Sequence, residues 1–306
     1  MKKYAIILLA MIICIACHHD PLKTSSYHFK IKDTAASVSE MQIDSTKSVL
    51  KKRLLNSKYE NPVVSYDGAK KIFTVTVNGD IDKDFIGNWL LKPCKTFFYE
   101  TYRIDELAPV LTIQPSASSD EKEKKEKFVA SISLTGPQIS STGVAYYPPY
   151  IGAVKESGIA AFEKAKKNML FDFPVDNVFA YGLPEQATHS KIREIMVYAL
   201  KINDGSLPIH QYTASAKMAF DEMGRASIRV NLNAAGAKRF ERMTTKNVNK
   251  ALAIVMDGTV YSAPTVVSAI AGGNMEIAGN FSAEEARQLA NMLSAGYLPL
   301  ALDIVR

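Results

Sequence analysis

The sequence predicts a mixed α+β protein in which short strands and helices alternate along most of the chain. Three stretches carry this prediction, because each combines strand-like and helix-like spacing of apolar residues: 27–103, 226–263 and 282–305. The chain has 306 residues, of which 47% are hydrophobic and 22% are charged, as is typical of a folded protein. One core seldom organises so many residues, so we expect two domains or one domain with a large insertion.

The first stretch opens with a strand and a helix. Apolar and polar side chains alternate over residues 27–31, as in a strand with one buried face. A helix is predicted from about Val38, because Ser37 and Glu40 have the spacing of a capping box. The spacing of the following apolar residues then gives this helix one buried face.

Two strands, a second helix and an aromatic strand complete this stretch. The strands are predicted at 62–66 and 71–78, on either side of an Asp-Gly turn at 67–68. A helix then opens at Asp82, and residues 96–102 form the aromatic strand. The resulting order, β-α-β-β-α-β, is the ferredoxin-like arrangement.

The C-terminal part alternates in the same way. Residues 226–232 are a predicted strand, Asn233 caps the helix that follows, and residues 252–263 form a hairpin. Ser282 opens a second capping box, and an apolar strand follows that helix at 298–305. We expect this last helix and strand to complete the sheet of the first stretch, with an α+β unit inserted between them.

Residues 104–209 are harder to assign. The mixed charges of 120–127 suit a solvated linker or an exposed helix. Tyr146, Tyr147 and Tyr150 flank two prolines, which stiffen the loop, and tyrosine rings offer a broad amphipathic contact surface. We therefore take these three tyrosines as candidate polypeptide-binding residues. The alternative is that their rings cover the core of this region itself.

The N-terminus indicates export from the cytoplasm. Lys2 and Lys3 precede an uncharged run, 4–16, which is shorter than the roughly 20 residues of a spanning helix and typical of a secretory signal. Ala16 ends this run and Cys17 follows it. This pair resembles the lipobox of bacterial lipoproteins, which implies that Cys17 carries lipid. The alternative is an ordinary cleaved signal in which Cys17 has no role.

The sequence contains no sign of catalysis and predicts no cofactor or metal. It lacks the G-x-S-x-G and H-E-x-x-H patterns and a phosphate-binding loop, and its C-x-x-C spacing, Cys14 to Cys17, falls at the end of the predicted signal. His18 and His19 have no partner at ligand spacing, and Cys94 is expected to be a small buried hydrophobe. The net charge of +6 is spread over interspersed acids and bases, so nucleic acid is not an expected partner.

Several C-terminal segments carry a family resemblance. Ala253–Pro264, Gly272-Gly273, Ile277–Ala286 and Ser294–Pro299 follow one another in an order that resembles the first periplasmic domain of SecD, the protein-export factor. In that family a movable head is inserted into a base. Gly272, Gly273 and Gly279 match the family's glycines and are candidate turn positions, with a hinge role as the alternative.

The resemblance implies a division of the chain into parts. We expect the following: a signal peptide (1–16), a lipidated tether (17–26), the N-terminal part of the base (27–103), an insert or linker with part of the head (104–209), the head (210–280) and the C-terminal part of the base (281–306). SecD continues into membrane helices, whereas the sequence stops at Arg306. We therefore expect a module that binds but does not itself couple to a proton gradient.

The resemblance also implies a function. We expect a non-enzymatic lipoprotein of the bacterial cell envelope, facing the periplasm and anchored in the inner or the outer membrane. It would bind unfolded or translocating polypeptide in support of Sec-dependent protein export, by strand addition at open sheet edges. The alternative is a scaffold or regulatory lipoprotein that docks on the translocase or on another envelope complex. An enzyme housed in the insert is a third possibility.

Overall fold

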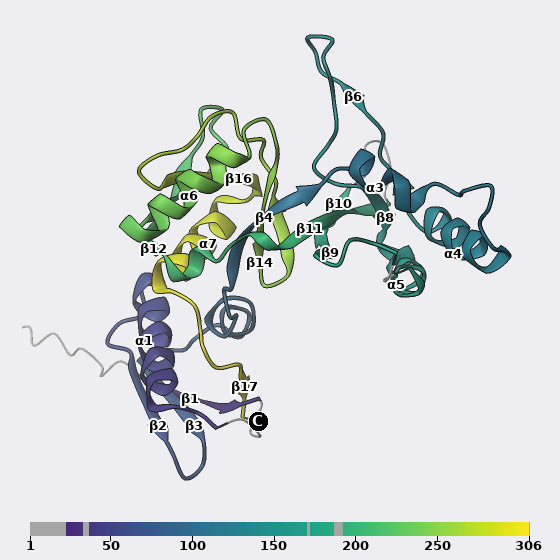
Figure 1. Ribbon diagram of the computed structural model, residues 1–306. Coiled ribbons are helices and arrows are strands. Elements are labelled where there is room, and N and C mark those ends of the chain that lie inside the picture. The colour runs from purple at the N-terminus through teal and green to yellow at the C-terminus, as the bar shows by residue number, and fades with distance from the viewer. Residues whose placement is uncertain (1–22, 33–36, 170–171, 187–191, 306) are drawn as a thin grey trace, which may run out of the picture.

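The computed structural model describes residues 23–32, 37–169, 172–186 and 192–305, which form an elongated molecule (Figure 1). A small sheet lies at one end, a helix-covered region lies in the middle, and an arm extends to the other end. The mixed α+β class is confirmed. The predicted signal peptide, Cys17 and the His18-His19 pair lie outside the described residues.

The sheet at the first end, here called the base sheet, contains residues from both ends of the chain. Its strands are β1 (Thr24–Ile31), β2 (Val63–Asp67), β3 (Ile72–Asn78) and β17 (Leu302–Ile304). Their order is β17-β1-β3-β2, and every neighbouring pair is antiparallel. The helix α1 (Glu40–Asn56) packs with them around a buried apolar cluster. The C-terminal strand thus joins the sheet of the first strand, as the sequence predicts.

Local details at the start of the base differ from the prediction. β1 begins at Thr24 and pairs with β3 from there, so the expected tether overlaps the strand. The N-cap of α1 is Ser39 rather than Ser37: its Oγ accepts a hydrogen bond from Gln42 N at 3.2 Å, and Gln42 Oε1 accepts one from Ser39 N at 3.0 Å. Two capping patterns overlap here, and the second places Glu40 in the first turn, where the helix dipole favours an acid.

The aromatic strand β4 (Thr96–Tyr102) forms as predicted but does not join the base sheet. This corrects the expectation that it closes the β-α-β-β-α-β unit. β4 pairs with β14 (Leu252–Met256) and with β11 (Arg193–Leu207), while β17 takes the place beside β1. Both edges of β4 are therefore satisfied in another sheet. The spacing of apolar residues does not encode this choice of partner.

A ring of five strands forms the centre of the molecule. β4, β14 and β11 are joined by β15 (Thr259–Ser262) and β9 (Asn177–Gly182), and the pairings run β4-β14-β15-β9-β11 and back to β4. The strands of this ring enclose a separate cluster of buried apolar side chains, namely Ala180, Leu200, Ala253, Val255 and Val260. A closed ring has no free edge between its strands, so it links its neighbours firmly. The predicted hairpin at 252–263 belongs to this ring.

The arm is built outward from β11. The elements of this region are α3 (Ile104–Leu111), α4 (Ser119–Ala130), β5 (Ser133–Leu134), β6 (Gln138–Ile139), β7 (Ala145–Tyr146), β8 (Gly152–Lys155), η2 (Glu156–Gly158), α5 (Ile159–Asn168) and β10 (Glu185–Gln186). Phe128 and Phe162 are fully buried in its core. The charged run 120–127 lies on α4, and β6 and β7 form a separate hairpin that projects from the body (Figure 1).

The helix-covered region contains a third sheet of β12 (Thr213–Phe220), β13 (Ala226–Leu232) and β16 (Asn274–Phe281), in that order. α6 (Ala234–Lys246) and α7 (Ala283–Ala295) share an apolar core with it, and Phe98 of β4 belongs to the same core. Asn233 caps α6, and the Ser282 capping box opens α7, both as predicted. α7 packs on the sheet and also on α1 of the base.

Short helices occupy the two remaining connections. η3 (Ile209–Gln211) precedes β12. The chain leaves the base through α2 (Lys83–Phe85), whose N-cap Asp82 accepts a hydrogen bond from Asp84 N at 2.6 Å, and then through the π-helical turn η1 (Ile86–Leu90). It returns from α7 through residues 296–301 to β17.

Candidate functional site

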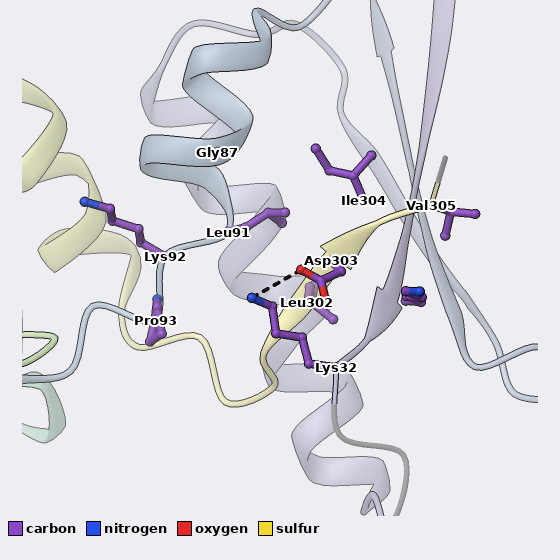
Figure 2. Close-up of a pocket in the computed structure, with 10 residues that line it drawn as sticks. Lys32, Gly87, Leu91, Lys92, Pro93, Leu302, Asp303, Ile304 and Val305 are labelled. Atoms are coloured by element: carbon purple, nitrogen blue, oxygen red, sulfur yellow. Dashed lines mark ion pairs between the residues drawn. The ribbon is translucent and has the colours of Figure 1, made fainter.

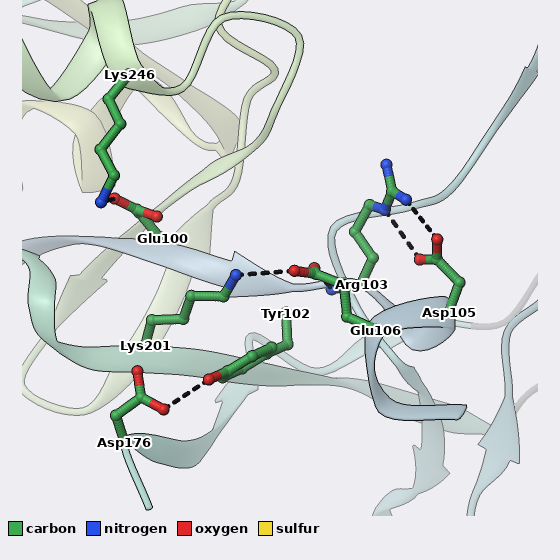
Figure 3. Close-up of polar contacts among 8 residues, drawn as sticks. All are labelled: Glu100, Tyr102, Arg103, Asp105, Glu106, Asp176, Lys201 and Lys246. Carbon is green, nitrogen blue, oxygen red and sulfur yellow. Dashed lines mark hydrogen bonds and ion pairs between the residues drawn. The ribbon is translucent and has the colours of Figure 1, made fainter. Parts of the chain in front are cut away.

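Charged side chains gather where β4, β11 and α6 meet (Figure 3). Glu100 lies opposite Lys201 in the β4–β11 ladder, and Lys246 Nζ lies 3.0 Å from Glu100 Oε1. Glu100 is only 7% exposed. Burial acts to raise its pKa, but hydrogen bonds from Lys246 and Asn247 and the charges of Lys246 and Lys201 outweigh burial and lower the pKa. Glu100 is therefore a fixed negative charge at neutral pH.

Lys201 makes two further contacts with neighbouring side chains. Its Nζ lies 2.9 Å from Glu106 Oε1 and 4.3 Å from the centre of the Tyr102 ring. Tyr102 in turn donates a hydrogen bond to Asp176 Oδ1 at 2.6 Å. Burial and this hydrogen bond both raise the pKa of the Tyr102 hydroxyl. The phenol therefore remains protonated and serves as a donor that holds β4 to the segment before β9.

Arg103 connects the charged group to the tyrosine segment. As the N-cap of α3, its backbone N donates to Glu106 Oε2 at 2.8 Å, and its Nε donates to Asp105 Oδ1 at 2.9 Å. The hydrogen bond from Arg103 lowers the pKa of the Asp105 carboxyl. The guanidinium also lies over the ring of Tyr147, 5.1 Å from its centre, in a cation–π contact.

Of the charged residues above, Glu100, Arg103, Glu106 and Lys201 line a pocket of about 540 Å³ between three parts of the chain. The hairpin contributes Tyr146, Tyr147 and both prolines, β4, α3 and β11 contribute the charged residues, and the loop after α6 contributes Asn247, Asn249 and Lys250. Tyr146 is 47% exposed, and its hydroxyl donates to Gln138 Oε1 at 3.0 Å. The pocket therefore combines apolar ring faces, tyrosine hydroxyl groups and charges of both signs.

The third predicted tyrosine lies apart from this pocket. Tyr150 packs edge-on against Tyr198 of β11, with ring centres 6.1 Å apart. None of Tyr146, Tyr147 and Tyr150 belongs to the apolar core of the arm among the described residues. Two of the three candidates thus share one pocket, and the third packs against β11.

The three predicted glycines have different surroundings. Gly272 and Gly273 have positive φ values of 79° and 70°, which L side chains rarely adopt. A Cβ on Gly273 would also lie 2.8 Å from Ala237 Cβ on α6. Gly279 lies at the register shift between β16 and β13, where a Cβ would lie 2.7 Å from the Phe281 ring. Turn geometry thus favours glycine at 272 and 273, and close packing favours it at 273 and 279.

Cys94 is buried, and burial raises its thiol pKa to about 11, so the unreactive thiol dominates at neutral pH. Within the described ranges, no three His, Cys, Asp or Glu residues are close enough together to hold a metal ion. In the same part of the chain, no helix has the length and apolar character needed to cross a membrane.

No motif in the sequence marks the charged residues of the pocket as a site. One signal was available: Glu100 is a lone carboxylate in the aromatic strand 97–102. A carboxylate in a strand with neighbours on both sides is seldom buried without a cationic partner. Which cations would meet it depends on β11 and α6, which lie over 100 residues further along the chain.

Comparison of this architecture with known proteins identifies its class. The chain has the fold of a solved structure described as "a membrane component SecDF that enhances protein export". The TM-score is 0.54 at 19% sequence identity, and the match covers 92% of this chain and 98% of the other. A SecDF crystal structure in a super-membrane-facing form gives a TM-score of 0.55 at 20% identity, with coverage of 94% and 30%. The fold is thus that of a SecDF periplasmic domain.

Sequence comparison relates the chain to SecD and SecDF proteins in particular. Residues 210–300 match the family model of the SecDF P1 head subdomain, and the match includes α7. The SecD of Syntrophobacter fumaroxidans is 39% identical over 40% of this chain and 23% of its own length, and the SecDF of Thermus thermophilus is 44% identical over 30% and 12%. The SecD of Magnetococcus marinus is 26% identical over 91% and 56%. The chain is therefore related to SecD and SecDF through their periplasmic region, as the resemblance implied.

The aligned part is a fraction of these relatives. The chain spans 23% of the SecD of Syntrophobacter fumaroxidans, 12% of the SecDF of Thermus thermophilus and 56% of the SecD of Magnetococcus marinus. The range matched by the head subdomain contains the β12-β13-β16 sheet, α6 and α7, and also the ring strands β14 and β15.

Proposed function

We propose that the chain is a non-enzymatic, polypeptide-binding module that supports Sec-dependent protein export on the periplasmic side of a bacterial membrane. Its relatives are named protein translocase subunits SecD and SecDF. We extend the role in protein translocation that these names state to this chain, through the region that it shares with them. A lipid on Cys17 would hold the module at the membrane surface, since several acyl chains together give a stable attachment.

The observation that carries this proposal is the pocket between the hairpin, the ring and the loop after α6. An unfolded polypeptide offers exposed apolar side chains, peptide groups and charges in no fixed order. Tyr146 and Tyr147 supply apolar faces with hydroxyl groups, and Lys250 and Glu106 supply opposite charges at the rim. Such a mixed surface suits a binder of many sequences better than one shaped for a single small molecule.

The state of the charges favours binding over catalysis. Glu100 and Asp105 both have lowered pKa values, Lys246 and Arg103 being among the causes. A general acid or base at neutral pH needs a pKa near 7. These carboxylates are instead held ionised in pairs, which positions the walls of the pocket.

We also infer that the base is a ferredoxin-like unit in which α7 and β17 supply the last helix and strand. The antiparallel order β17-β1-β3-β2, with α1 between β1 and β2, supports this inference. In this arrangement the ring, the arm and the β12-β13-β16 sheet together form one insertion between β3 and α7. The elongated insertion would extend the tyrosine pocket away from the base.

Site-specific photocrosslinking in secreting cells tests the proposal. The full chain would carry a benzophenone amino acid at Tyr146, with the exposed Met41 on α1 as the matched control position. We expect crosslinks from position 146 to secreted polypeptides in transit and few from position 41. Equal labelling at the two positions would show that the pocket does not bind them. Crosslinks only to folded envelope proteins would support the scaffold alternative.

A substitution pair completes the test. Tyr146→Ala removes a ring from the pocket, whereas Val144→Ala changes an exposed apolar residue of the same hairpin outside it. We expect at least threefold less crosslinked secreted polypeptide from a second pocket position, 147, in the first variant, and no change in the second.

A further inference from the structure

The edge of the base sheet borders a groove of about 880 Å³ (Figure 2). One side of the groove is β17, the last strand of the sheet, with Ile304 47% exposed. The opposite side is η1 and the segment that follows it, represented by Gly87, Leu91 and Pro93. This groove is separate from the tyrosine pocket, which lies between the ring and the arm.

The backbone of β17 has unpaired groups that face away from β1. Lys32 N donates to Ala301 O, and Val305 N donates to His28 O, both at 2.9 Å. In an antiparallel pair, hydrogen-bonded and non-hydrogen-bonded residues alternate, so 301, 303 and 305 face β1. Leu302 and Ile304 therefore direct their N–H and C=O groups outward. Among the described residues, no backbone hydrogen bond reaches these four groups.

The opposite wall leaves room for an added strand. A Cβ on Gly87 would meet nothing within 4 Å, so the groove is open beside η1. Leu91 and Ile304 give the groove apolar sides, as a strand between a sheet edge and a helix requires. A partner in this position would pair with β17 through its backbone and place alternate side chains against η1.

The charges around the groove select among partners. Lys30, Lys32 and Lys92 line it with one carboxylate, Asp303, which lies 3.2 Å from Lys32 Nζ. Two copies of this chain paired edge to edge would bring two sets of three lysines together, which opposes a dimer. An extended segment with acidic side chains would meet the excess positive charge favourably.

We propose that the outer edge of β17 binds an extended polypeptide segment carrying acidic side chains, which adds to the base sheet as a fifth strand. This inference rests on the proposed function as a polypeptide binder and assigns it a second site. Backbone pairing would supply affinity for any extended segment, and the three lysines would supply the preference for acidic ones. The site and the tyrosine pocket can be tested independently.

A proline substitution tests the backbone contact. Ile304→Pro removes one outward N–H while leaving the groups that pair with β1 in place, and edge strands tolerate proline. Ile304→Val keeps the N–H and serves as the matched control. Binding of a fluorescein-labelled peptide of alternating valine and glutamate to the full chain would be measured by anisotropy. We expect at least tenfold weaker binding for Ile304→Pro and less than a twofold change for Ile304→Val.

Two further variants separate this site from a loss of folding. Gly87→Leu fills the groove without touching β17 and should weaken peptide binding at least tenfold while the thermal unfolding midpoint does not fall. Lys92→Gln should weaken binding of the glutamate peptide severalfold but leave a glutamine version of the peptide unchanged. Unchanged binding in both Ile304→Pro and Gly87→Leu would overturn the proposal.

The remaining outcomes also decide the question. If the chain instead forms a dimer that Ile304→Pro abolishes, with no peptide bound, β17 is a self-association edge and the proposal is wrong. If crosslinking at Tyr146 succeeds while the β17 variants have no effect, the proposed function stands and this site fails. If the β17 variants lose the glutamate peptide while Tyr146 gives no crosslinks, this site stands and the tyrosine pocket fails.

Discussion

Arg53 of α1 donates a hydrogen bond from Nη2 to the carbonyl oxygen of Gly296, 3.2 Å away, at the point where the chain returns from α7 to the base. The same guanidinium donates to Leu90 O at 2.9 Å and to Pro93 O at 3.3 Å, where the chain leaves the base. One side chain, 2% exposed, therefore holds both connections between the base and the rest of the molecule. Its acceptors are neutral carbonyls, and burial lowers the pKa of the guanidinium.

Replacing Arg53 should destabilise the protein strongly. Arg53→Met keeps the apolar stem but leaves several buried carbonyls without a donor, at about 1 to 3 kcal/mol for each group that water cannot reach. We expect a loss of at least about 3 kcal/mol in the free energy of unfolding, measured in urea. Lys52→Met, an exposed neighbour on α1, should change it by less than about 0.5 kcal/mol. Equal losses in the two variants would show that the carbonyl contacts are not needed.

Glu100 should make stability depend on pH in the acid range. Its pKa is lowered in the folded protein, so the unfolded chain binds a proton first as pH falls. The stabilising contribution is complete above the ordinary carboxyl value and is lost as pH falls through the folded pKa. We expect Glu100→Gln to cost about 1 to 3 kcal/mol at pH 7 and progressively less as the pH falls through the folded pKa of Glu100. A difference that does not change with pH would argue against this ion pair.

Gly273 and Gly258 offer a matched test of turn strain against packing. Both have positive φ, but a Cβ on Gly258 meets nothing within 4 Å, whereas one on Gly273 would lie 2.8 Å from Ala237 Cβ. We expect Gly258→Ala to cost about 1 to 2 kcal/mol from backbone strain alone. Gly273→Ala should cost about 1 to 3 kcal/mol more, because α6 must move. Similar thermal unfolding midpoints for the two variants would show that packing against α6 is not limiting.

The lipid attachment predicted at Cys17 has a direct test. Cys17→Ala should move the protein from the membrane fraction to the soluble fraction, because the acyl chains would be lost. Cys94→Ala is the control, since that thiol is buried within the fold and should leave fractionation unchanged. Incorporation of radioactive palmitate should disappear in the first variant only. A Cys17→Ala protein that stays with the membrane would require another attachment.

The sequence predicts much of the local structure because the signals are local. The second capping box, Ser282 with Glu285, places α7 correctly, and Asn233 does the same for α6. The capping box of α1 was displaced by two residues because two equivalent patterns overlap between Ser37 and Gln42. The alternation of apolar and polar residues identifies β1 and β3 as strands but does not indicate which strands pair with them.

The candidate site was predictable only in part. Tyr146 and Tyr147 stood out because two aromatic residues beside two prolines are unusual in composition, and they line one pocket. Glu100, Lys201 and Lys246 did not, because each is an ordinary charged residue until β11 and α6 bring them together. Arg53 was missed for the same reason, since its acceptors are backbone carbonyls that any sequence provides.

The amino-acid sequence alone determined the helices α1, α6 and α7 and the strands of the stretches 27–103 and 226–263, because hydrogen bonds within a few residues and the spacing of apolar side chains specify them. Only the tertiary structure decided that β4 pairs with β14 and β11, that β17 lies beside β1, and that one guanidinium spans both connections to the base. Those choices depend on which backbone edges and apolar faces remain unpaired once distant segments have packed, and no local pattern records that competition.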